Sequence, residues 1–415
     1  MDESSNQTAP KLKTIQSEAL SQFFSIATPD AVKFVDALLQ EAVRLGASDV
    51  LLEPLSHRLR VRARIDGVIY LLGDLGIDSY SSIASRVKIL ASLDPTEKRK
   101  IQEGQITVEY SGGQINLRVE IAHTIHGELV VIRVHEKATI VLNLAELGFS
   151  KTSYQIYQNI LSRRSGLVLV CGPTGCGKTT TLYSTIAKLN ENQDFNVMTI
   201  ENPVEFQLEG VNQMQTQEET GFTFADGLKA ILRLTPDIVL VGEIRDKETA
   251  EIAVESGLTG QLVLSTLHAS DSVGALYRLL DLGIENYFLN SALSGIVAQR
   301  LVRMTCQSCK APYEPRQDEV DIFTKVVGRP PKQLLKGAGC EECRHLAYKG
   351  RTGIFEVLAM TAKVRDFIRD RANEDILRSR LEEDGFITLF RDGLEKAEQG
   401  ITTIDEVMRN SLRAV

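Results

Sequence analysis

The 415-residue chain contains no tryptophan, few aromatic residues and no long hydrophobic run. Aromatic residues make up only 6% of the sequence, so a stacking platform for single-stranded nucleic acid is not expected. The formal net charge of −8 argues against a broadly basic surface that would bind DNA or RNA. The longest apolar runs lie within 166–171 and 237–242 and have the length of strands, too short to cross a membrane.

The amino-terminal residues lack the basic start and the apolar stretch of a secretory signal peptide. We therefore expect a cytoplasmic protein that contacts a membrane only through partners. A chain of this length, with 43% hydrophobic and 25% charged residues, is expected to form two or three globular domains.

The first third of the chain has the pattern of a small α+β domain. Residues 1–27 are polar and are expected to form a loose tail or a frayed helix. Thr28-Pro29-Asp30 then has the residues of a helix start, with Thr28 as the cap, and Gly46 supplies a stop. The remaining elements expected here are a helix over 81–93, strands over 105–110, 114–121 and 129–134, and a turn at Ser111-Gly112-Gly113.

Residues 58–65 alternate strictly between arginine and apolar residues, which predicts a strand with one arginine face. Two interpretations stay open at this point. The arginines form either a solvated strand face or a surface that meets an acidic partner.

From about residue 165 the pattern becomes strand, glycine loop and helix, repeated. Short β-rich runs occur at 167–170, 197–201, 238–241 and 262–265, separated by helical segments. This alternation predicts an α/β fold with a mostly parallel sheet and helices on both faces. A charged helical region is expected from about residue 361 to the end of the chain.

The strongest motif is Gly172-Pro173-Thr174-Gly175-Cys176-Gly177-Lys178-Thr179, a phosphate-binding loop between an expected strand and an expected helix. Its glycines let backbone amides point at phosphate oxygens, and the following helix directs its positive dipole end at the same anion. Lys178 is expected to reach the β and γ phosphates of ATP, and the Thr179 hydroxyl to hold Mg²⁺. Thr180 completes the candidate nucleotide-binding residues. Cys176 is interpreted as a small neutral filler, with a redox switch as the alternative.

Three acids and one histidine stand near other strand ends. Glu243 follows an apolar strand, where this class of protein places an acid beside Mg²⁺ and the attacking water. Glu201 and Glu205 flank a proline turn and are candidates to orient or deprotonate water, although an ordinary acidic turn has the same pattern. His268 ends a further strand and is a candidate sensor of the γ-phosphate, with a packed structural histidine as the alternative.

Four of the six cysteines form two Cys-x-x-Cys pairs, Cys306 with Cys309 and Cys340 with Cys343. Four thiolates suit a closed tetrahedral Zn²⁺ site without an open catalytic position. We expect about one structural zinc ion per chain; a redox pair is the alternative.

These motifs, in this order and spacing, resemble those of the secretion and pilus-assembly ATPases of type II secretion and type IV pilus systems. The resemblance runs from about residue 30 to the carboxyl terminus. The sequences that carry it, besides the phosphate loop, are Ala47-Ser-Asp-Val50, Arg64-Ile-Asp-Gly67, Gly127-Glu128, Glu243-Ile-Arg-Asp246, Ser265-Thr-Leu-His-Ala269, Gln299-Arg-Leu-Val302 and Gly350-Arg-Thr-Gly-Ile-Phe-Glu356.

The resemblance implies a RecA-like P-loop ATPase domain preceded by a small PAS-like α+β domain. The expected organisation is a tail (1–27), an α+β domain (28–136), a linker (137–150), the ATPase domain (151–300), a four-cysteine zinc module (301–356) and a helical region (357–415).

The family also implies a cytoplasmic homohexamer at the inner face of the inner membrane, held there by a platform protein and the assembly machinery. By the same resemblance, Glu201 polarises the attacking water, Glu243 supports Mg²⁺ and His268 couples nucleotide state to the subunit interface. Arg118 and Arg133 are the arginines expected to reach the γ-phosphate, with ordinary surface charges as the alternative. The cysteine module favours the assembly and export branch.

Several positions depart from the family pattern. Asn202 replaces a usual Asp, Gln261 a common first histidine, Gln105 an arginine, and Leu234-Thr235 a Gln-Asp pair. The long amino-terminal domain of many secretion ATPases is also not expected, since only about 30 residues precede the recognisable region. We expect the chain to hydrolyse ATP, and we expect the loss of a negative charge at Asn202 to slow the reaction. The alternatives are a non-catalytic regulator in mixed rings with an active paralogue, and a nucleic-acid motor of similar fold.

Overall fold

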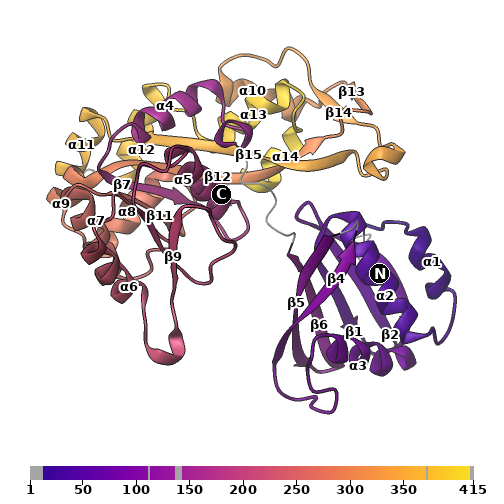
Figure 1. Ribbon diagram of the computed structural model, residues 1–415. Coiled ribbons are helices and arrows are strands. Elements are labelled where there is room, and N and C mark those ends of the chain that lie inside the picture. Colours follow the sequence, from indigo (N-terminus) through magenta and orange to yellow (C-terminus); the bar gives the residue numbers. More distant parts are fainter. Residues whose placement is uncertain (1–12, 111–112, 136–142, 371–372, 412–415) are drawn as a thin grey trace, which may run out of the picture. The chain divides into compact units, whose positions relative to one another are not determined.

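The computed structural model describes residues 13–110, 113–135, 143–370 and 373–411. The chain divides into two compact units, Met1–Thr139 and Ile140–Val415 (Figure 1). Residues 1–12, Ser111 and Gly112 of the expected turn, residues 136–142 at the start of the expected linker, residues 371–372 and the last four residues lie outside the described part. No helix in the described part is long and apolar enough to cross a bilayer.

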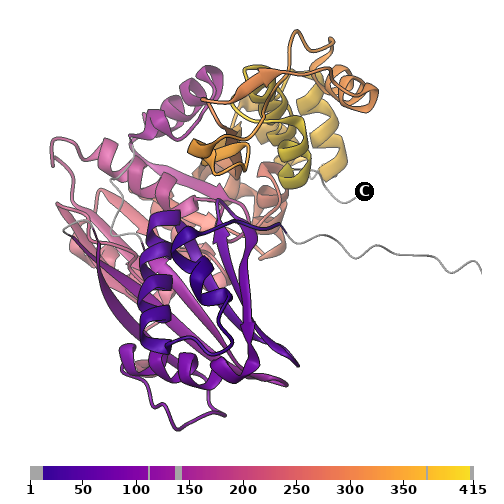
Figure 2. The same cartoon turned by 90° about the vertical axis from the view of Figure 1, so that its right-hand side faces the viewer.

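The first unit is built on a six-stranded antiparallel sheet in the order β3-β2-β1-β6-β5-β4. Helices lie across one face of this sheet (Figure 2). In chain order its elements are α1 (Glu18–Phe24), α2 (Ala31–Leu45), β1 (Ala47–Pro54), β2 (Arg58–Ile65), β3 (Val68–Gly76), η1 (Ile77–Ser79), α3 (Tyr80–Leu90), β4 (Gln102–Tyr110), β5 (Gly113–Thr124) and β6 (Gly127–His135).

The amino-terminal segment, expected as a loose tail or a frayed helix, contains the short helix α1, and this helix is packed rather than loose. Leu20 and Phe23 of α1 are buried, and Phe23 meets Phe34 of α2 edge to face. The cap of α2 is also different from the one expected. Asp30 rather than Thr28 accepts hydrogen bonds from the first free amides, because its carboxylate reaches them at 2.9 and 3.2 Å.

The arginine face of β2 is paired within its own sheet. Arg62 contacts Glu53, and Arg64 contacts Asp49 at 3.2 Å, both acids being on β1. Arg60 contacts Asp74 of β3 at 3.2 Å. The acidic partner of this face is therefore supplied by the neighbouring strands.

The second unit contains a seven-stranded sheet in the order β15-β12-β7-β11-β10-β8-β9, in which only the β12–β15 pair is antiparallel. Its elements up to β11 are η2 (Leu144–Glu146), α4 (Lys151–Leu161), β7 (Gly166–Cys171), α5 (Lys178–Leu189), β8 (Val197–Glu201), β9 (Val211–Gln215), η3 (Glu218–Thr220), α6 (Phe224–Ile231), η4 (Leu232–Leu234), β10 (Ile238–Val241), α7 (Lys247–Leu258) and β11 (Leu262–Leu267). The remaining elements are α8 (Ser272–Asp281), α9 (Asn286–Ala292), β12 (Leu293–Thr305), β13 (Lys310–Pro312), α10 (Gln317–Val327), β14 (Leu335–Gly337), η5 (Glu341–Cys343), β15 (Tyr348–Ala359), α11 (Ala362–Arg369), α12 (Glu374–Glu383), α13 (Leu389–Glu398) and α14 (Ile404–Ser411).

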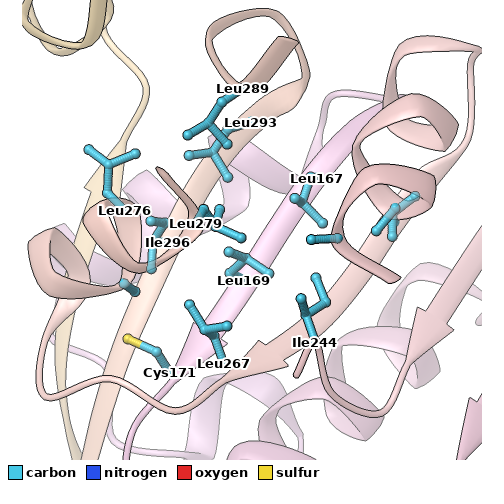
Figure 3. Close-up of a cluster of buried hydrophobic side chains, with 14 of the residues drawn as sticks. Leu167, Leu169, Cys171, Ile244, Leu267, Leu276, Leu279, Leu289, Leu293 and Ile296 are labelled. Carbon is cyan, nitrogen blue, oxygen red and sulfur yellow. The ribbon is translucent and has the colours of Figure 1, made fainter. Parts of the chain in front are cut away.

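Two apolar layers cover the sheet, one on each face, and they bury its central strands on both sides. Leu167, Leu169 and Cys171 of β7 point to one side, where they pack with α6 to α9, α11 and α12 (Figure 3). The alternate residues Val168 and Val170 pack on the other side with α4 and α5. The predicted α/β class with a mostly parallel sheet and a helical carboxyl-terminal region is confirmed.

The four-cysteine segment is an excursion between two strands of this sheet. The expected module boundary at residue 301 falls inside β12, and the far end of the module is β15, which pairs with β12 along its length. A separate small core lies beside the excursion, where α10, α13 and α14 bury residues such as Phe323, Leu394 and Ile404. We call this part, residues 306–347 with α13 and α14, the cysteine lobe.

Candidate functional site: one edge of the parallel sheet

Four parallel strands end at the same edge of the second sheet, and a predicted motif follows each of them. The hydrogen-bond register aligns the last residues of β7, β11, β10 and β8. In sheet order the edge carries the phosphate loop after β7, His268 after β11, Glu243 after β10 and Glu201 at the end of β8. The carboxyl edge of an open α/β sheet is where such folds bind ligands.

The backbone of the phosphate loop can be built only with glycine at two positions. Gly172 has φ +152°, and a Cβ there would lie 2.6 Å from the carbonyl oxygen of Gln299. Gly177 has φ +89°, and a Cβ there would lie 2.8 Å from the amide nitrogen of the Gln299 side chain. Gln299 of β12 also accepts a hydrogen bond of 2.6 Å from Thr181 on α5. The loop is therefore pressed against β12, a contact that the sequence motif alone did not indicate.

Lys178 lies across the loop that it follows. Its ammonium group donates to the carbonyl oxygens of Gly172 and Pro173 at 2.9 and 3.0 Å. Thr179 and Thr180, the next residues of α5, are exposed. An ammonium held by two carbonyls can exchange them for phosphate oxygens, and an exposed Thr179 hydroxyl is available to a hydrated cation.

Cys176 is a buried side chain within the loop. Burial raises the pKa of its thiol, although Lys178 and Arg300 act in the opposite direction. A thiol that stays protonated at neutral pH is a poor nucleophile. This environment favours the interpretation of Cys176 as a filler over that of a redox switch.

Glu201 is only 4% exposed, and its carboxylate is surrounded by donors from three elements. The hydroxyl of Tyr183 on α5 donates to one oxygen. Thr199 of β8 and Gln213 of β9 donate to the other, at 2.6 and 3.1 Å. Sequence reasoning missed Tyr183 and Gln213; only the position of Tyr183, one turn after Thr179 on the phosphate-loop helix, offered a signal.

Glu205, the second acid of this box, lies exposed in the loop after β8. The negative charge of Glu205 is one of the smaller causes that raise the pKa of Tyr183, after burial and the hydrogen bond to Glu201. The structure thus places Glu205 as an exposed acid near Tyr183, and its part in catalysis stays a prediction.

Glu243 and His268 face each other across neighbouring strand ends. The carboxylate of Glu243 lies 2.5 Å from the guanidinium of Arg245 and 3.8 Å from Nε2 of His268. The Glu243 side chain is 15% exposed and that of His268 56% exposed. His268 is therefore accessible from solvent rather than packed in the core.

The loop that follows His268 is held from β12 and β15. Arg300 donates to the carbonyl oxygen of Ser270 at 2.5 Å. Ser272 donates through its amide and hydroxyl to Glu356, at 2.9 and 2.5 Å. Burial raises the pKa of Glu356, although these hydrogen bonds oppose the shift. Arg300 and Glu356 belong to the two family-like motifs that flank the cysteines. Both side chains form hydrogen bonds with the loop after His268.

The same loop is also tied to the carboxyl-terminal helices. Asp271 caps α8 by accepting from Gly274 at 2.8 Å, and it pairs with Arg378 of α12 at 2.7 Å. Asp271 and Arg378 have side chains that are 9% and 18% exposed. No sequence pattern pointed to Arg378, which lies 107 residues after its partner.

Arg118 and Arg133 lie side by side in the sheet of the first unit. They are register partners on β5 and β6, and Gln105 of β4 stands opposite Arg118 on the other side. Arg118 pairs with Glu103 at 2.7 Å, and Arg133 with Asp49 at 3.3 Å. Their reach toward a nucleotide stays a prediction.

The four predicted zinc ligands come together in the second unit. Their sulfur atoms all lie within 4.8 Å of one another. The measured sulfur separations are 3.9 Å for Cys306–Cys340 and 3.8 Å for Cys309–Cys343 and Cys340–Cys343. A tetrahedral site with zinc–sulfur bonds of 2.3 Å requires sulfur atoms about 3.8 Å apart, whereas a disulfide requires about 2 Å.

Backbone amides point at two of these sulfur atoms. Gly339 donates to Cys309 at 3.3 Å and Cys340 donates to Cys343 at 3.2 Å. Burial opposes ionisation of Cys343, but hydrogen bonds from the backbone of Cys340 and Ala347 and from the neighbouring thiols lower its pKa to about 7, whereas burial raises the pKa of Cys309 to about 11. Zinc binds thiolates, so the cluster fits a structural Zn²⁺ held by Cys306, Cys309, Cys340 and Cys343.

The departures from the family pattern lie in different places. Gln261 precedes β11 and Leu234-Thr235 precedes β10, so both are at the amino edge of the sheet, opposite the phosphate loop. A strand of this length separates the two edges by roughly 15–20 Å. Among the departures in this unit, Asn202 alone stands beside the candidate site.

Comparison with known proteins agrees with this geometry. Residues 28–409 match the family model described as type II/IV secretion system protein. The chain is 41% identical over 378 residues to the type II secretion system ATPase E of Vibrio cholerae, covering 91% of this chain and 75% of the relative. It is 40% identical over 386 residues to the type IV pilus assembly ATPase PilB of Myxococcus xanthus, covering 92% and 68%.

Among solved structures, the ATPase DotB of Yersinia pseudotuberculosis matches with a TM-score of 0.68 at 21% identity, covering 97% of this chain and 99% of that one. This likeness concerns the fold. The match of the family model over most of the chain, together with relatives at about 40% identity, shows that the chain belongs to the type II/IV secretion system protein family.

Proposed function

We propose that the chain is a cytoplasmic ATPase that couples ATP hydrolysis to the assembly of a pseudopilus or pilus and to protein export. The observation that carries this proposal is the gathering of the phosphate loop, Glu201, Glu243 and His268 at one edge of the sheet. The two relatives above are named as a secretion ATPase and a pilus-assembly ATPase, at nearly equal identity. The sequence identities therefore support an ATPase of this family, and they do not decide between a type II secretion system and a type IV pilus.

The residues at the edge divide the work of phosphoryl transfer. Bound Mg²⁺–ATP supplies the phosphoanhydride bond to be broken. The loop amides and Lys178 hold the phosphates, and Thr179 provides a hydroxyl for the metal ion. Glu201 orients and polarises the attacking water, and Glu243 supports the metal and the water from the neighbouring strand. His268, exposed and next to Glu243, responds to the nucleotide state.

The cysteine lobe favours the assembly and export direction within the family. Its four sulfur atoms are spaced for a closed structural zinc site. We propose that it binds one Zn²⁺ per chain, which stabilises the excursion between β12 and β15.

The working form that we propose is a homohexamer at the inner face of the inner membrane, bound there through a platform protein. The arginine pair of the first unit, Arg118 and Arg133, is proposed to approach the nucleotide in that assembly. Sedimentation of the purified chain with ATP and Mg²⁺ tests the oligomer, and a species that stays monomeric under all nucleotide conditions contradicts it.

A non-catalytic regulator is less well supported by the geometry. Lys178, Thr179, Glu201 and Glu243 are all present at the edge, and Gln261 and Leu234-Thr235 are remote from it. A nucleic-acid motor also receives no support, because the net charge is −8.

The decisive experiment compares ATP turnover by the purified chain with that of Lys178→Ala. We expect the substitution to lower turnover by about 100-fold or more, because it removes a charge that stabilises the transition state. Equal rates for the two proteins would overturn the proposal. Phosphate release at saturating Mg²⁺–ATP, with EDTA as the blank, provides the measurement.

A further inference from the structure

The residue that joins the phosphate-loop helix to the buried acid of β8 is Tyr183. It is fully buried on α5, and its ring meets Phe206 edge to face at 4.6 Å. Its hydroxyl donates to the carboxylate of Glu201. The phenol therefore orients the side chain that ends β8, and its ring packs against the loop that follows that strand.

The helix that carries Tyr183 also carries the phosphate-binding groups. Lys178 and Thr179 form the first turn of α5, and Tyr183 lies four residues after Thr179, on the same side of the helix one turn later. A ligand that is held at the helix start therefore fixes the height and rotation of the Tyr183 hydroxyl. Because Tyr183 is closely packed in the core, its hydroxyl has little freedom to move relative to the helix.

The donors that contact Glu201 within the described part of the chain are uncharged. They are Tyr183, Thr199 and Gln213, and each comes from a different element around the carboxylate. Neutral donors orient a carboxylate without neutralising its charge, which keeps it able to polarise water. Thr199 is on the same strand as Glu201, and Gln213 is on the edge strand β9. Tyr183 is therefore the donor that links the position of the carboxylate to the phosphate-loop helix α5.

We propose that Tyr183 is a positioning residue for hydrolysis, whose hydroxyl sets the carboxylate of Glu201 in register with Lys178 and Thr179. The inference rests on the proposed function, since it requires that Glu201 acts on the attacking water. Burial and the hydrogen bond to Glu201 raise the pKa of Tyr183 far above its ordinary value, so the hydroxyl remains a donor at every working pH.

The test is Tyr183→Phe, which removes one oxygen and keeps the ring. The chain offers a matched control in Tyr157→Phe. Tyr157 is equally buried and donates or accepts a 2.9 Å hydrogen bond with Thr185 on the same helix α5, but it does not contact Glu201. Both changes remove one buried hydroxyl that is bound to a neighbour, so their structural cost is similar.

We expect Tyr183→Phe to lower kcat by about 10- to 100-fold, the effect of losing one hydrogen bond to a charged group. KM for ATP and the affinity for ADP should stay within about twofold, because the loop and Lys178 are untouched. Tyr157→Phe should show neither change. A kcat of Tyr183→Phe equal to or above that of Tyr157→Phe, or a loss expressed in KM alone, overturns the proposal.

A double-mutant cycle separates positioning from a general loss of structure. If Tyr183 acts through Glu201, Tyr183→Phe costs nothing further in a Glu201→Gln background. Additive losses in the two backgrounds overturn the proposal, because they assign Tyr183 an effect independent of Glu201. Failure of the proposed function itself is distinguishable: the wild-type protein then turns over no faster than Lys178→Ala, which removes both conclusions.

Discussion

The edge of the second sheet that carries the phosphate loop (the phosphate edge) and the cysteine lobe are the two candidate ligand sites of the second unit, and they differ in how firmly the protein holds its own candidate binding groups. At the phosphate edge, Lys178 rests on two carbonyl oxygens and Thr179 is exposed. In the lobe, Cys306 and Cys343 are buried, and amides already point at the sulfur atoms of Cys309 and Cys343.

The difference follows from what each region must do with its ligand. A nucleotide has to enter and leave in every cycle, so its groups stay accessible and exchange one partner for another. A structural metal ion does not exchange in a cycle, and two of its four candidate ligands, Cys306 and Cys343, are buried. The comparison predicts that damage to the lobe is measured in stability and damage to the edge in turnover.

Removing a zinc ligand should have the largest effect on stability. We expect Cys343→Ser to abolish the one zinc ion per chain and to lower the free energy of unfolding by roughly 5 kcal/mol or more, because metal binding is coupled to folding. Metal analysis and thermal unfolding check this, with Ser308→Ala, an exposed change in the same segment, as the control. A variant that keeps its metal or its melting temperature contradicts the enclosed site.

Breaking the buried ion pair at the base of the lobe should come next. Arg303 of β12 binds Glu406 of α14 at 2.7 Å, and its guanidinium lies 4.0 Å from the ring of Tyr348. Arg303→Gln leaves a buried carboxylate unpaired and should cost about 3–5 kcal/mol. Urea unfolding measures this cost, and the exposed pair of Arg316 with Asp405 on the same helix α14 provides the control. Equal losses for Arg303→Gln and Arg316→Gln would contradict the importance of burial.

The stability that the Arg303–Glu406 pair contributes should depend on pH. Burial alone would raise the pKa of Glu406, but the hydrogen bonds and charge of Arg303 outweigh it and hold the pKa below its ordinary value of 4.5. A lowered pKa in the folded state stabilises the fold above the unfolded value, and this contribution is lost as pH falls through the folded value. The stability difference between wild type and Arg303→Gln should therefore shrink below about pH 4.5. Urea unfolding between pH 3 and 6 measures it; a constant difference contradicts the assignment.

A change at the far side of the phosphate edge should affect turnover more than stability. Arg378 holds Asp271 in the loop after His268, whereas Arg380 on the same helix pairs with Glu383 in solvent. We expect Arg378→Gln to lower kcat about fivefold and Arg380→Gln to leave it unchanged, since only the first releases the loop. Steady-state ATPase assays measure kcat for both variants. Equal kcat values would show that the contact of α12 with the loop after His268 does not affect turnover.

The smallest change is expected at the thiols of the phosphate edge. Burial raises the pKa of Cys171 and Cys176, so both should resist alkylation at pH 7. After chelation of the metal, the four lobe cysteines should react within the same time. Mass spectrometry of the alkylated peptides gives the extent at each site. Rapid labelling of Cys176 in the folded protein would revive the redox interpretation.

The parts of the molecule that could be predicted are those whose physical cause is local in sequence. Apolar runs gave β7, β8, β10 and β11 nearly to the residue, because a strand buried on both faces needs them. The phosphate loop was predictable for a similar reason, since its glycines and Lys178 are consecutive. The cysteine pairs were predictable because metal ligands require regular spacing.

The parts that could not be predicted depend on residues that meet only in the fold. Gln213 and Arg378 reach Glu201 and Asp271 from other elements, and nothing in their neighbouring sequence distinguishes them from ordinary surface residues. The return of β15 to the ATPase sheet was missed because the cysteines suggested a separate module. Asp30 rather than Thr28 caps α2 because a difference of two residues at a helix start is decided by backbone geometry.

Strand β12 connects these two regions in a single piece. Its residues 293–298 pair with β7, Gln299 and Arg300 contact the phosphate loop and the segment after His268, Arg303 binds α14, and Cys306 follows its last residue. About 20 Å of extended backbone therefore separates Arg300 from the first zinc ligand. The strand is continuous from the phosphate loop to Cys306, with one irregularity in its pairing between Arg303 and Thr305. We therefore expect a displacement of the cysteine lobe to alter the position of Gln299 and Arg300 beside the phosphate loop.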